Sequence, residues 1–186
     1  ESFNSLIKAI EEKSYGISGG MMIGHNGFVH HTCVRNPNLM IGLLDFTNLR
    51  KIFPNNPWHK KFYYLDLNLN NSNASVDAVS GGYMLIRRSV VKRIGLLDQK
   101  YFMYLEDVDY CNRARNAGFK VIYCPKSIIF HEGGASSKNK DKIDFNAWID
   151  SRKYFFMKNG SLLTNFIIQP IFAIDAIAMK IWRKIR

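Results

Sequence analysis

Three carboxylates crowd together in the 186-residue chain, where Glu106, Asp107 and Asp109 stand almost side by side. A carboxylate held near a substrate hydroxyl can take up its proton, which makes each of them a candidate general base. The pair Gly81-Gly82 precedes them on a predicted strand, and His131 follows them after another strand. This order would bring three groups to one edge of a sheet: a glycine backbone that a substrate can approach closely, a carboxylate and an imidazole. The pattern therefore indicates a site for acid–base chemistry.

A structural explanation exists for the same residues. The dipole of a helix favours negative charge at its N-terminus, and the three carboxylates open a predicted helix. His131, taken by itself, is also more typical of a structural histidine than of a ligand. The residue types alone leave both explanations open.

The elements that must position these residues alternate between strand and helix. We predict a buried strand over 78–86, interrupted by the glycine pair, and then a short helix that Ser89 caps and Gly95 ends. A longer helix begins with the carboxylates and runs to Ala117. Such alternation predicts an α/β fold.

The C-terminal part continues this alternation and then becomes helical. Strands are predicted over 119–123 and 127–130, with Pro125 as the break between them. From about residue 144 the pattern is helical in two pieces that divide near Gly160.

The N-terminal part is less regular. A helix is predicted over 2–13, followed by strands over 17–23 and 28–34. The stretch 35–75 is rich in Asn, Pro and basic residues, so we predict long loops with one short helix over 43–53.

The composition is that of a globular domain with an unusual charge. Hydrophobic residues make up 47% and charged residues 22%, which excludes wholesale disorder. Twenty-six Lys and Arg against fifteen Asp and Glu give a formal charge of +11. The excess favours an anionic partner, which could be nucleic acid, an acidic lipid surface or a phosphorylated small molecule. The 3 cysteines form no C-x-x-C pair, which indicates a reducing compartment.

A series of short motifs follows residue 78. They are Val79-Ser-Gly-Gly-Tyr-Met-Leu-Ile-Arg-Arg88, Ile94-Gly-Leu-Leu-Asp98, Tyr101-Phe-Met-Tyr-Leu-Glu-Asp-Val-Asp109, Arg113, Ala117-Gly118, Pro125 and His131-Glu-Gly-Gly-Ala-Ser136. In order and spacing the series resembles glycosyltransferase family 2, in its bacterial polysaccharide-type branch with rhamnosyltransferase-like members.

The resemblance implies a fold and a division of the chain. We expect the C-terminal part of a GT-A-type nucleotide-diphospho-sugar transferase fold, a mixed sheet flanked by helices, with a C-terminal helical extension. Residues 1–136 would be a partial domain that lacks the N-terminal nucleotide-binding half, and residues 137–186 a helical tail. Members of the family hold a divalent cation, Mg²⁺ or Mn²⁺, with a short acidic motif at the end of that half. No Asp-x-Asp candidate occurs before Asp45, so we expect the acceptor-side half alone, inactive without its donor half.

The resemblance also implies roles for the site residues. Asp107 would be the general base of an inverting transfer, and Glu106 an acceptor ligand or a carboxylate that tunes the base. Asp109 is interpreted as structural, paired with Arg113 one helical turn later. His131 would approach the metal or the diphosphate. The remaining candidates for substrate binding are Ser80, Gly81, Gly82, Tyr104 and Arg88.

The implied partners are a nucleotide-diphosphate sugar, with dTDP-rhamnose as a candidate, and a glycan or lipid-linked acceptor. Nucleic acid is not expected, because net charge is its only support and no RNA-binding motif interleaves basic and aromatic residues. A non-catalytic interaction or membrane-attached subunit stays open as an alternative. No zinc site is predicted from His30, His31 and Cys33, since no second ligand pair has the required spacing.

The last helix is predicted to be amphipathic. At about 100° per residue, its polar side and its apolar side separate. The polar side holds Asn165, Gln169, Lys180 and Arg183, and the apolar side holds Ile167, Ile171, Ile174, Ala178, Ile181, Trp182 and Ile185. Pro170 and Asp175 argue against a helix that spans a membrane.

Two interpretations of this helix stay open. Its basic residues beside Trp182 suit an anionic membrane surface, whereas the apolar stripe also suits docking on the missing half or on another subunit. We therefore expect a cytoplasmic protein, peripheral on the cytoplasmic face of the bacterial inner membrane.

Overall fold

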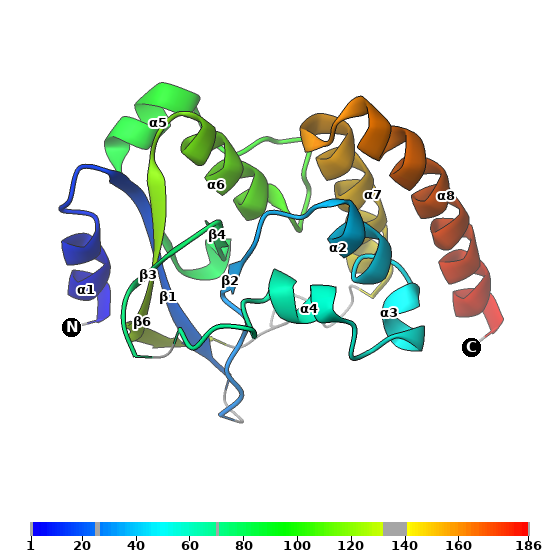
Figure 1. Cartoon of the computed structure of the whole chain (residues 1–186), viewed down its shortest axis with the longest axis horizontal. Helices are drawn as coiled ribbons and strands as arrows, with labels where there is room; N and C mark the ends of the chain where they lie inside the picture. Colours follow the sequence, from blue (N-terminus) through cyan, green and yellow to red (C-terminus); the bar gives the residue numbers. More distant parts are fainter. Residues whose placement is uncertain (1, 25–26, 70, 132–140, 186) are drawn as a thin grey trace.

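The computed structural model describes residues 2–24, 27–69, 71–131 and 141–185, and it shows a mixed sheet flanked by helices (Figure 1). Within these residues, a four-stranded sheet has the order β3-β6-β1-β5, and β2 and β4 form a separate antiparallel pair. The strands are β1 (Tyr15–Ile23), β2 (Cys33–Val34), β3 (Ala74–Val76), β4 (Ala78–Val79), β5 (Met84–Ile86) and β6 (Lys120–Phe130). The predicted α/β class and mixed sheet are confirmed.

The two long strands, β1 and β6, lie parallel at the centre of the sheet, and β3 and β5 pair antiparallel on either side. Successive side chains of a strand point to opposite faces. Accordingly, Val121 and Tyr123 of β6 lie in the main hydrophobic core. Ile122 and Cys124 lie in a second cluster, with Leu6. Both faces of the sheet are therefore covered by apolar side chains.

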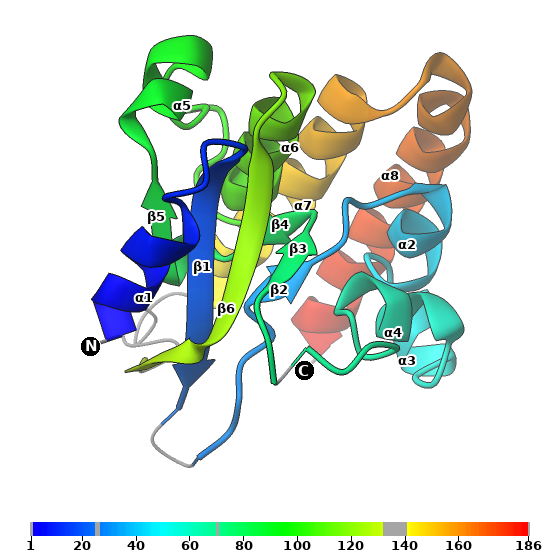
Figure 2. The same ribbon diagram turned by 60° about the vertical axis from the view of Figure 1, so that its left-hand side comes forward.

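Helices cover these two faces. Figure 2 shows α1 (Ser2–Ala9) on one side of β1 and β6, with α6 (Glu106–Asn116) on the other. The short α5 (Arg88–Ile94) follows β5 and leads to the turn that precedes α6. The segment just before β5 and the start of α6 thus lie side by side.

The stretch predicted as long loops contains three short helices. They are α2 (Leu39–Leu44), α3 (Leu49–Ile52) and α4 (Pro57–Phe62). The side chain of Asn38 caps α2 by accepting the backbone N–H of Ile41, and the side chain of Asn56 caps α4 by accepting that of His59. Asn56 followed by Pro57 is a typical helix start, so the sequence held a signal for α4 that the prediction missed.

Two long helices, α7 (Asp141–Asn159) and α8 (Leu162–Ile185), complete the chain, and their division near Gly160 is confirmed. They pack into the main core, to which Phe156 and Ile168 contribute. A methyl group on Gly42 of α2 would overlap both of these side chains, so a glycine is required for this close approach. The domain boundary predicted after residue 136 stays a prediction, because residues 132–140 lie outside the described ranges.

An ion pair joins α7 to α8 inside the core. Arg152 is fully buried, and its Nη1 lies 2.7 Å from Oδ2 of Asp175. The same guanidinium donates to the carbonyl of Phe46. The backbone N–H and the side-chain amide of Asn48 donate to the other oxygen of Asp175, at 2.9 and 3.0 Å. This network fixes α7, α8 and the segment between α2 and α3 against one another.

Some N-terminal boundaries differ from the prediction. The helix predicted over 2–13 ends at Ala9, and the strand predicted over 28–34 is reduced to Cys33–Val34 and an isolated bridge between Val29 and Ile23. The reason lies in the sheet, because β1 is already paired with β5 on one side and with β6 on the other. Residues 28–34 therefore have few unpaired backbone groups of β1 with which to form a strand.

Three further predictions need correction. The interruption predicted at Gly81 and Gly82 is present, but the 3₁₀ turn η1 (Gly81–Tyr83) there separates two strands, β4 and β5, that belong to different sheets. Arg87, not Ser89, precedes the first residue of α5. Pro125 does not end a strand, because β6 continues through it. The pairing with β1 shifts register there, as at a bulge. Proline has no backbone N–H to donate to a neighbouring strand, and the bulge removes the need for one.

Replacing Arg152 with methionine should lower the free energy of unfolding by about 3–5 kcal/mol, because the buried carboxylate of Asp175 loses its partner. The double variant Arg152→Met with Asp175→Leu should recover much of this loss, since it leaves no unpaired buried charge. Urea unfolding of the three proteins measures both effects. An equal loss in the single and double variants would show that packing, not charge, is responsible.

Candidate active site

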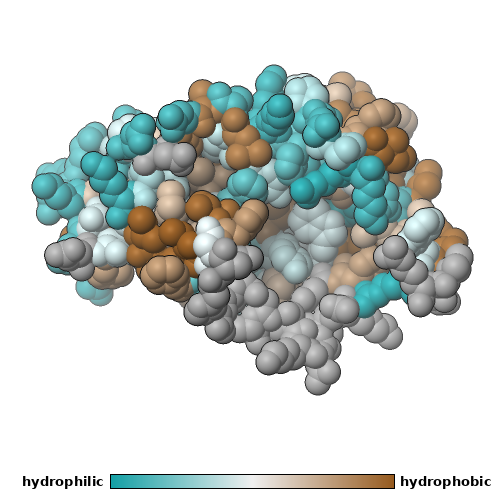
Figure 3. Space-filling model, turned by 90° about the horizontal axis from the view of Figure 1, so that it is seen from below, coloured by the Kyte–Doolittle hydropathy of each residue, from teal (hydrophilic) through white to brown (hydrophobic). Residues whose placement is uncertain are grey.

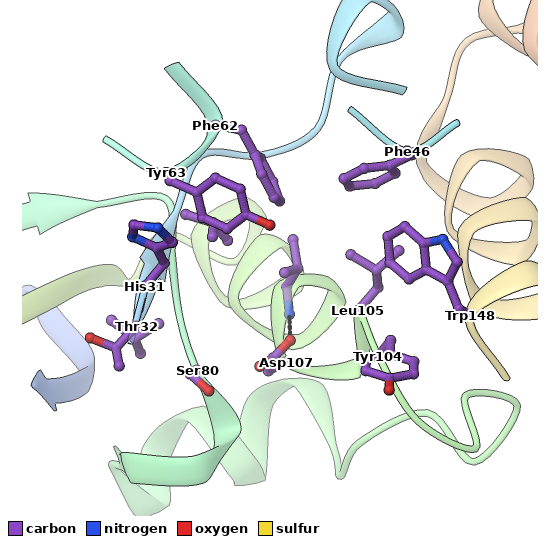
Figure 4. Close-up of a pocket in the computed structure, with 13 residues that line it drawn as sticks. His31, Thr32, Phe46, Phe62, Tyr63, Ser80, Tyr104, Leu105, Asp107 and Trp148 are labelled. Atoms are coloured by element: carbon purple, nitrogen blue, oxygen red, sulfur yellow. Dashed lines mark hydrogen bonds between the residues drawn. The ribbon is translucent and has the colours of Figure 1, made fainter. Parts of the chain in front are cut away.

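Asp107 lies in a pocket of about 170 Å³ that is bounded by the turn after β4, the start of α6 and the side of α7. The pocket brings together three of the predicted site residues, Ser80, Tyr104 and Asp107. Figure 4 shows Asp107 between the other two, below a group of aromatic rings. The glycines of η1 border the pocket, because the backbone N–H of Gly81 donates to Asp107.

The turn that presents the carboxylates is strained. Tyr104 and Leu105 both have left-handed backbone angles, with φ of 72° and 64°. Such a conformation costs a non-glycine residue roughly 1–2 kcal/mol, and it persists only where the surroundings enforce it. Leu105 is buried in the main core, which anchors the turn. The turn then delivers Glu106 and Asp107 as the first two residues of α6.

Two backbone N–H groups orient the Asp107 carboxylate. Gly81 donates to Oδ2 at 2.9 Å. Val108 donates to Oδ1 at 2.8 Å, the bond dashed in Figure 4. Burial raises the pKa of Asp107 above its ordinary value, while these two hydrogen bonds act in the opposite direction. A carboxylate that is fixed in position and holds a proton more strongly than usual is suited to general-base work.

Glu106 is a second candidate at the same place. Burial raises its pKa, and the neighbouring charge of Asp107 raises it further. Its Oε2 is buried and has no hydrogen-bond partner among the described residues. Buried polar atoms normally have a partner, so this oxygen is available to a substrate hydroxyl.

Ser80 lines the pocket, and the two glycines follow it in the chain. The Ser80 hydroxyl accepts the N–H of Gly82 at 3.3 Å, which closes the 3₁₀ turn. A methyl group on Gly81 would lie 3.5 Å from Cβ of Asp107, an ordinary van der Waals contact. The protein itself therefore has room for a side chain at position 81, and the glycine leaves open the space beside the carboxylate.

Aromatic side chains form much of the remaining lining, and they come from several elements. Phe46 lies between Phe62 and Trp148, with ring centroids 5.2 and 5.0 Å away. Tyr104 meets Trp148 edge to face at 5.9 Å. Sequence reasoning missed the lining residues His31, Thr32, Phe46, Phe62, Tyr63 and Trp148. Their common signal was weak, since an aromatic residue in a predicted loop or helix is indistinguishable from a core residue.

Asp109 is structural, as predicted, and its pairing with Arg113 is confirmed at 3.0 Å. The fully buried carboxylate also accepts Nζ of Lys158 at 2.8 Å, and Lys158 reaches Asp98 at the same distance. The hydrogen bond from Lys158, followed by that from the backbone N–H of Lys100, holds the pKa of Asp98 well below its ordinary range. The network ties α6 to α7 and so supports the turn that carries Asp107.

Five predicted site residues do not line this pocket. Glu106, Gly81 and Gly82 follow or precede lining residues in the chain, whereas Arg88 and His131 lie elsewhere. Arg88 is exposed at the start of α5, beyond the far end of β5 from Gly82. His131 follows β6, and its ring lies 6.1 Å from that of His30, edge to face. The roles predicted for Arg88 and His131 stay predictions.

The described residues do not complete a site for Mg²⁺ or Mn²⁺. These cations prefer oxygen ligands, and the described part of the chain contains no group of three histidine, cysteine or acidic side chains that could hold a metal. His30 has a buried Nε2 without a partner, but it faces an imidazole rather than a carboxylate. Cys33 is buried, and burial raises its pKa to about 12, which disfavours the thiolate that zinc requires.

A second cavity of about 720 Å³ adjoins the Asp107 pocket. The two share His31, Thr32 and Tyr63, and the second also includes His30. Burial, first of all, lowers the pKa of His31, so its imidazole is neutral at pH 7. Two connected cavities beside one oriented carboxylate are an arrangement that can hold two substrates.

The sequence is similar to known glycosyltransferases. The N-acetylglucosaminyl-diphospho-decaprenol L-rhamnosyltransferase of Mycobacterium tuberculosis is 31% identical over 142 residues, which are 76% of this chain and 45% of that protein. The rhamnosyltransferase WbbL of Escherichia coli is 42% identical over 60 residues, 32% of this chain and 23% of its own. A low-salt glycan biosynthesis hexosyltransferase of Haloferax volcanii, Agl10, is 28% identical over 85 residues, 46% of this chain and 27% of its own. The chain spans less than half the length of each relative.

The sequence profile of the family described as "Glycosyltransferase like family 2" matches residues 40–151. This range includes Ser80, Asp107 and Trp148 of the Asp107 pocket, whereas His31, Thr32 and Val34 of its lining precede the range. The chain therefore belongs to glycosyltransferase family 2 and is rhamnosyltransferase-like.

Proposed function

We propose that this chain provides the acceptor side of an inverting glycosyltransferase, with Asp107 as the general base. The observation that carries the proposal is the Asp107 carboxylate, which is held by two backbone N–H groups, has a raised pKa and faces a pocket. The proposed reaction moves a sugar from a nucleotide-diphosphate donor to a glycan or lipid-linked acceptor.

In this mechanism an acceptor hydroxyl enters the pocket and donates a hydrogen bond to Asp107. As the hydroxyl oxygen attacks the anomeric carbon of the donor, Asp107 takes its proton, and the bond to the nucleoside diphosphate breaks. Attack from the side opposite the leaving group inverts the anomeric centre. Glu106 would hold a second acceptor hydroxyl through its unpartnered Oε2, and the aromatic rings would exclude water.

The donor is proposed to approach from the second cavity, where His30 lies against His131. The rhamnosyltransferase relatives favour dTDP-rhamnose as the candidate donor. Among the described residues β5 is an edge strand, on which further strands of a nucleotide-binding half could add. The acidic ligands of a Mg²⁺ or Mn²⁺ ion are proposed to lie in that half, outside the described residues, and this chain alone is proposed to be inactive.

The acceptor is proposed to be lipid-linked. The M. tuberculosis relative carries a decaprenol diphosphate in its name, and an enzyme that acts on such a molecule must work at a membrane. We therefore propose that the protein is cytoplasmic and peripheral on the cytoplasmic face of the inner membrane.

The outer face of α8 supports membrane attachment. This helix turns Gln169 and Asp175 toward the protein and leaves many of its apolar residues exposed. Phe166, Ile174 and Ile177 are 80%, 68% and 60% exposed, and Figure 3 shows hydrophobic side chains along the edge where α8 lies. An exposed apolar face of this length needs a lipid or protein covering.

The segment Leu162–Arg183 is long and apolar enough to cross a membrane, although it contains Pro170 and Asp175. Its packing supports a surface location instead. Ile168, Phe172 and Ala176 are buried on the side that faces α2 and α7, so one side of the helix follows the domain. We propose that the other side lies in the interface of an anionic membrane, with Lys180 and Arg183 near its headgroups.

Replacing Asp107 with asparagine should reduce transfer by about 10²–10⁴-fold in the protein that includes the donor half, because an amide cannot accept the proton. Donor binding and the fold should persist. In the wild type, activity should fall as the pH drops through the raised pKa of this carboxyl, above the range of an exposed aspartate. Transfer assays over pH 4–9 with Asp107→Asn and Glu106→Gln check both points. Full turnover by Asp107→Asn would transfer the role of base to Glu106.

Replacing Gly81 with alanine should change the free energy of unfolding by less than about 1 kcal/mol, since the methyl group meets Asp107 at an ordinary contact distance. Transfer should nevertheless slow by about tenfold or more, because the methyl group narrows the space beside the base. Thermal unfolding and kinetics on the same variant separate the two effects. Unchanged kinetics would show that no substrate approaches the backbone here.

Replacing Phe166, Ile174 and Ile177 with serine should release the protein from anionic vesicles, because the apolar contact is lost while the buried side of α8 remains. Each basic residue near the surface contributes on the order of 1 kcal/mol. Binding of the wild type should therefore weaken, but not vanish, as salt rises and the Debye length falls from about 10 Å at 0.1 M to about 3 Å at 1 M.

The measurement is co-sedimentation with anionic and neutral vesicles. The matched control replaces Leu67, Leu96 and Phe102, which are exposed apolar residues outside α8, with serine. Truncation of α8 is unsuitable, because it would remove buried core residues. Equal recovery of the wild type and the α8 variant would contradict membrane attachment and favour a protein partner for this face.

A further inference from the structure

A groove of about 650 Å³ lies between α3, the start of α7 and the end of α8, at the lower right of Figure 1. Its apolar lining residues are Ile52, Phe145, Ala178, Met179 and Trp182. The polar residues that border it are Asn48, Lys51 and Arg183, and no acidic residue of the described chain lines it. The groove adjoins the outer apolar face of α8, since Trp182 and Ile181 are neighbours and both are exposed.

Among the described residues, two cations border this groove and no acidic side chain lines it. The guanidinium of Arg183 lies 4.9 Å above the ring of Phe145, and Lys51 is exposed in the last turn of α3. Neither residue forms an ion pair with an acidic side chain in the described part of the chain. An apolar groove bordered by two unpaired cations is complementary to an amphiphile with an anionic group.

The groove and the Asp107 pocket lie close together, on the two sides of one aromatic pair. Phe46 and Trp148, with ring centroids 5.0 Å apart, both line the Asp107 pocket. Phe145, one turn before Trp148 on α7, lines the groove, and so does Asn48, two positions after Phe46. The two cavities are therefore lined by residues one helical turn apart on α7 and two positions apart after α2.

We propose that the groove binds the isoprenoid chain of a lipid-linked acceptor, with Lys51 and Arg183 compensating the charge of its phosphate, while the sugar of the same molecule enters the Asp107 pocket. The inference rests on the proposed function and names the subsite for the lipid part of that acceptor. Its closeness to the catalytic carboxylate favours an isoprenoid phosphate over a bulk phospholipid, which has no chemistry to perform at Asp107.

The direct test measures equilibrium binding of geranylgeranyl phosphate to the chain, below the concentration at which the lipid forms micelles. Ala178 and Ala173 are both exposed on α8, but only Ala178 lines the groove. Ala178→Trp should fill the groove and weaken binding by about tenfold or more, whereas Ala173→Trp should leave it unchanged. Equal binding by the wild type and both variants would overturn the inference.

The charge contribution is tested with a second pair of variants. Lys51→Gln and Arg183→Gln should weaken binding of geranylgeranyl phosphate but not of geranylgeraniol, which lacks the phosphate. Lys60→Gln, an exposed lysine on α4, is the control. Equally tight binding of dioctanoyl phosphatidylglycerol would show a general lipid site and would also overturn the inference.

Failure of the inference and failure of the proposed function are distinguishable. In the protein with its donor half, Ala178→Trp should raise KM for a polyprenyl-diphosphate-linked acceptor without changing KM for the nucleotide sugar. Binding of geranylgeranyl phosphate does not depend on Asp107, so full turnover by Asp107→Asn would refute the base alone. Intact transfer with no difference between Ala178→Trp and Ala173→Trp would refute the groove alone.

Discussion

The buried ion pair between Arg152 and Asp175 decides which side of α8 faces the protein. A carboxylate inside a core requires a partner, and Asp175 has Arg152 and Asn48 as partners when this side of α8 faces the protein. The same side buries Ile168 and Phe172, whereas apolar residues such as Phe166, Ile174 and Ile177 stay exposed on the other side. The proposed membrane attachment and the groove beside α3 both depend on this orientation.

A second buried carboxylate, Asp109, has the corresponding role on the other side of α7. It binds Arg113 within α6 and Lys158 of α7, and Lys158 also binds Asp98 before the strained turn. The turn at Tyr104 and Leu105 is therefore supported at both ends, by core packing and by charge. The position of Asp107 therefore depends on these contacts as much as on the acidic motif itself.

The sequence predicted the α/β class, the two C-terminal helices and the Asp109–Arg113 pair, because each depends on local periodicity or on spacing within one helix. It placed Ser80, Tyr104 and Asp107 near one another through the family resemblance. The aromatic lining could not be predicted, since Phe46 and Trp148 meet only through tertiary packing. The helical wheel grouped Ile174, Ile181 and Trp182 on one side of α8, and these residues are exposed in the structure. It contains no information about Arg152, so the burial of Asp175 could not be predicted.

The helix α7 shows why these features occur together. It carries no single apolar stripe, which is typical of a helix contacted from several sides. Trp148 faces the Asp107 pocket, Phe145 faces the groove, Arg152 faces α8, and Lys158 faces α6. One helix thus contacts the element that carries Asp107, lines both cavities and fixes the orientation of α8. A sugar acceptor and its lipid chain would then be aligned by the same element, which keeps the reacting hydroxyl at a fixed distance from the membrane surface.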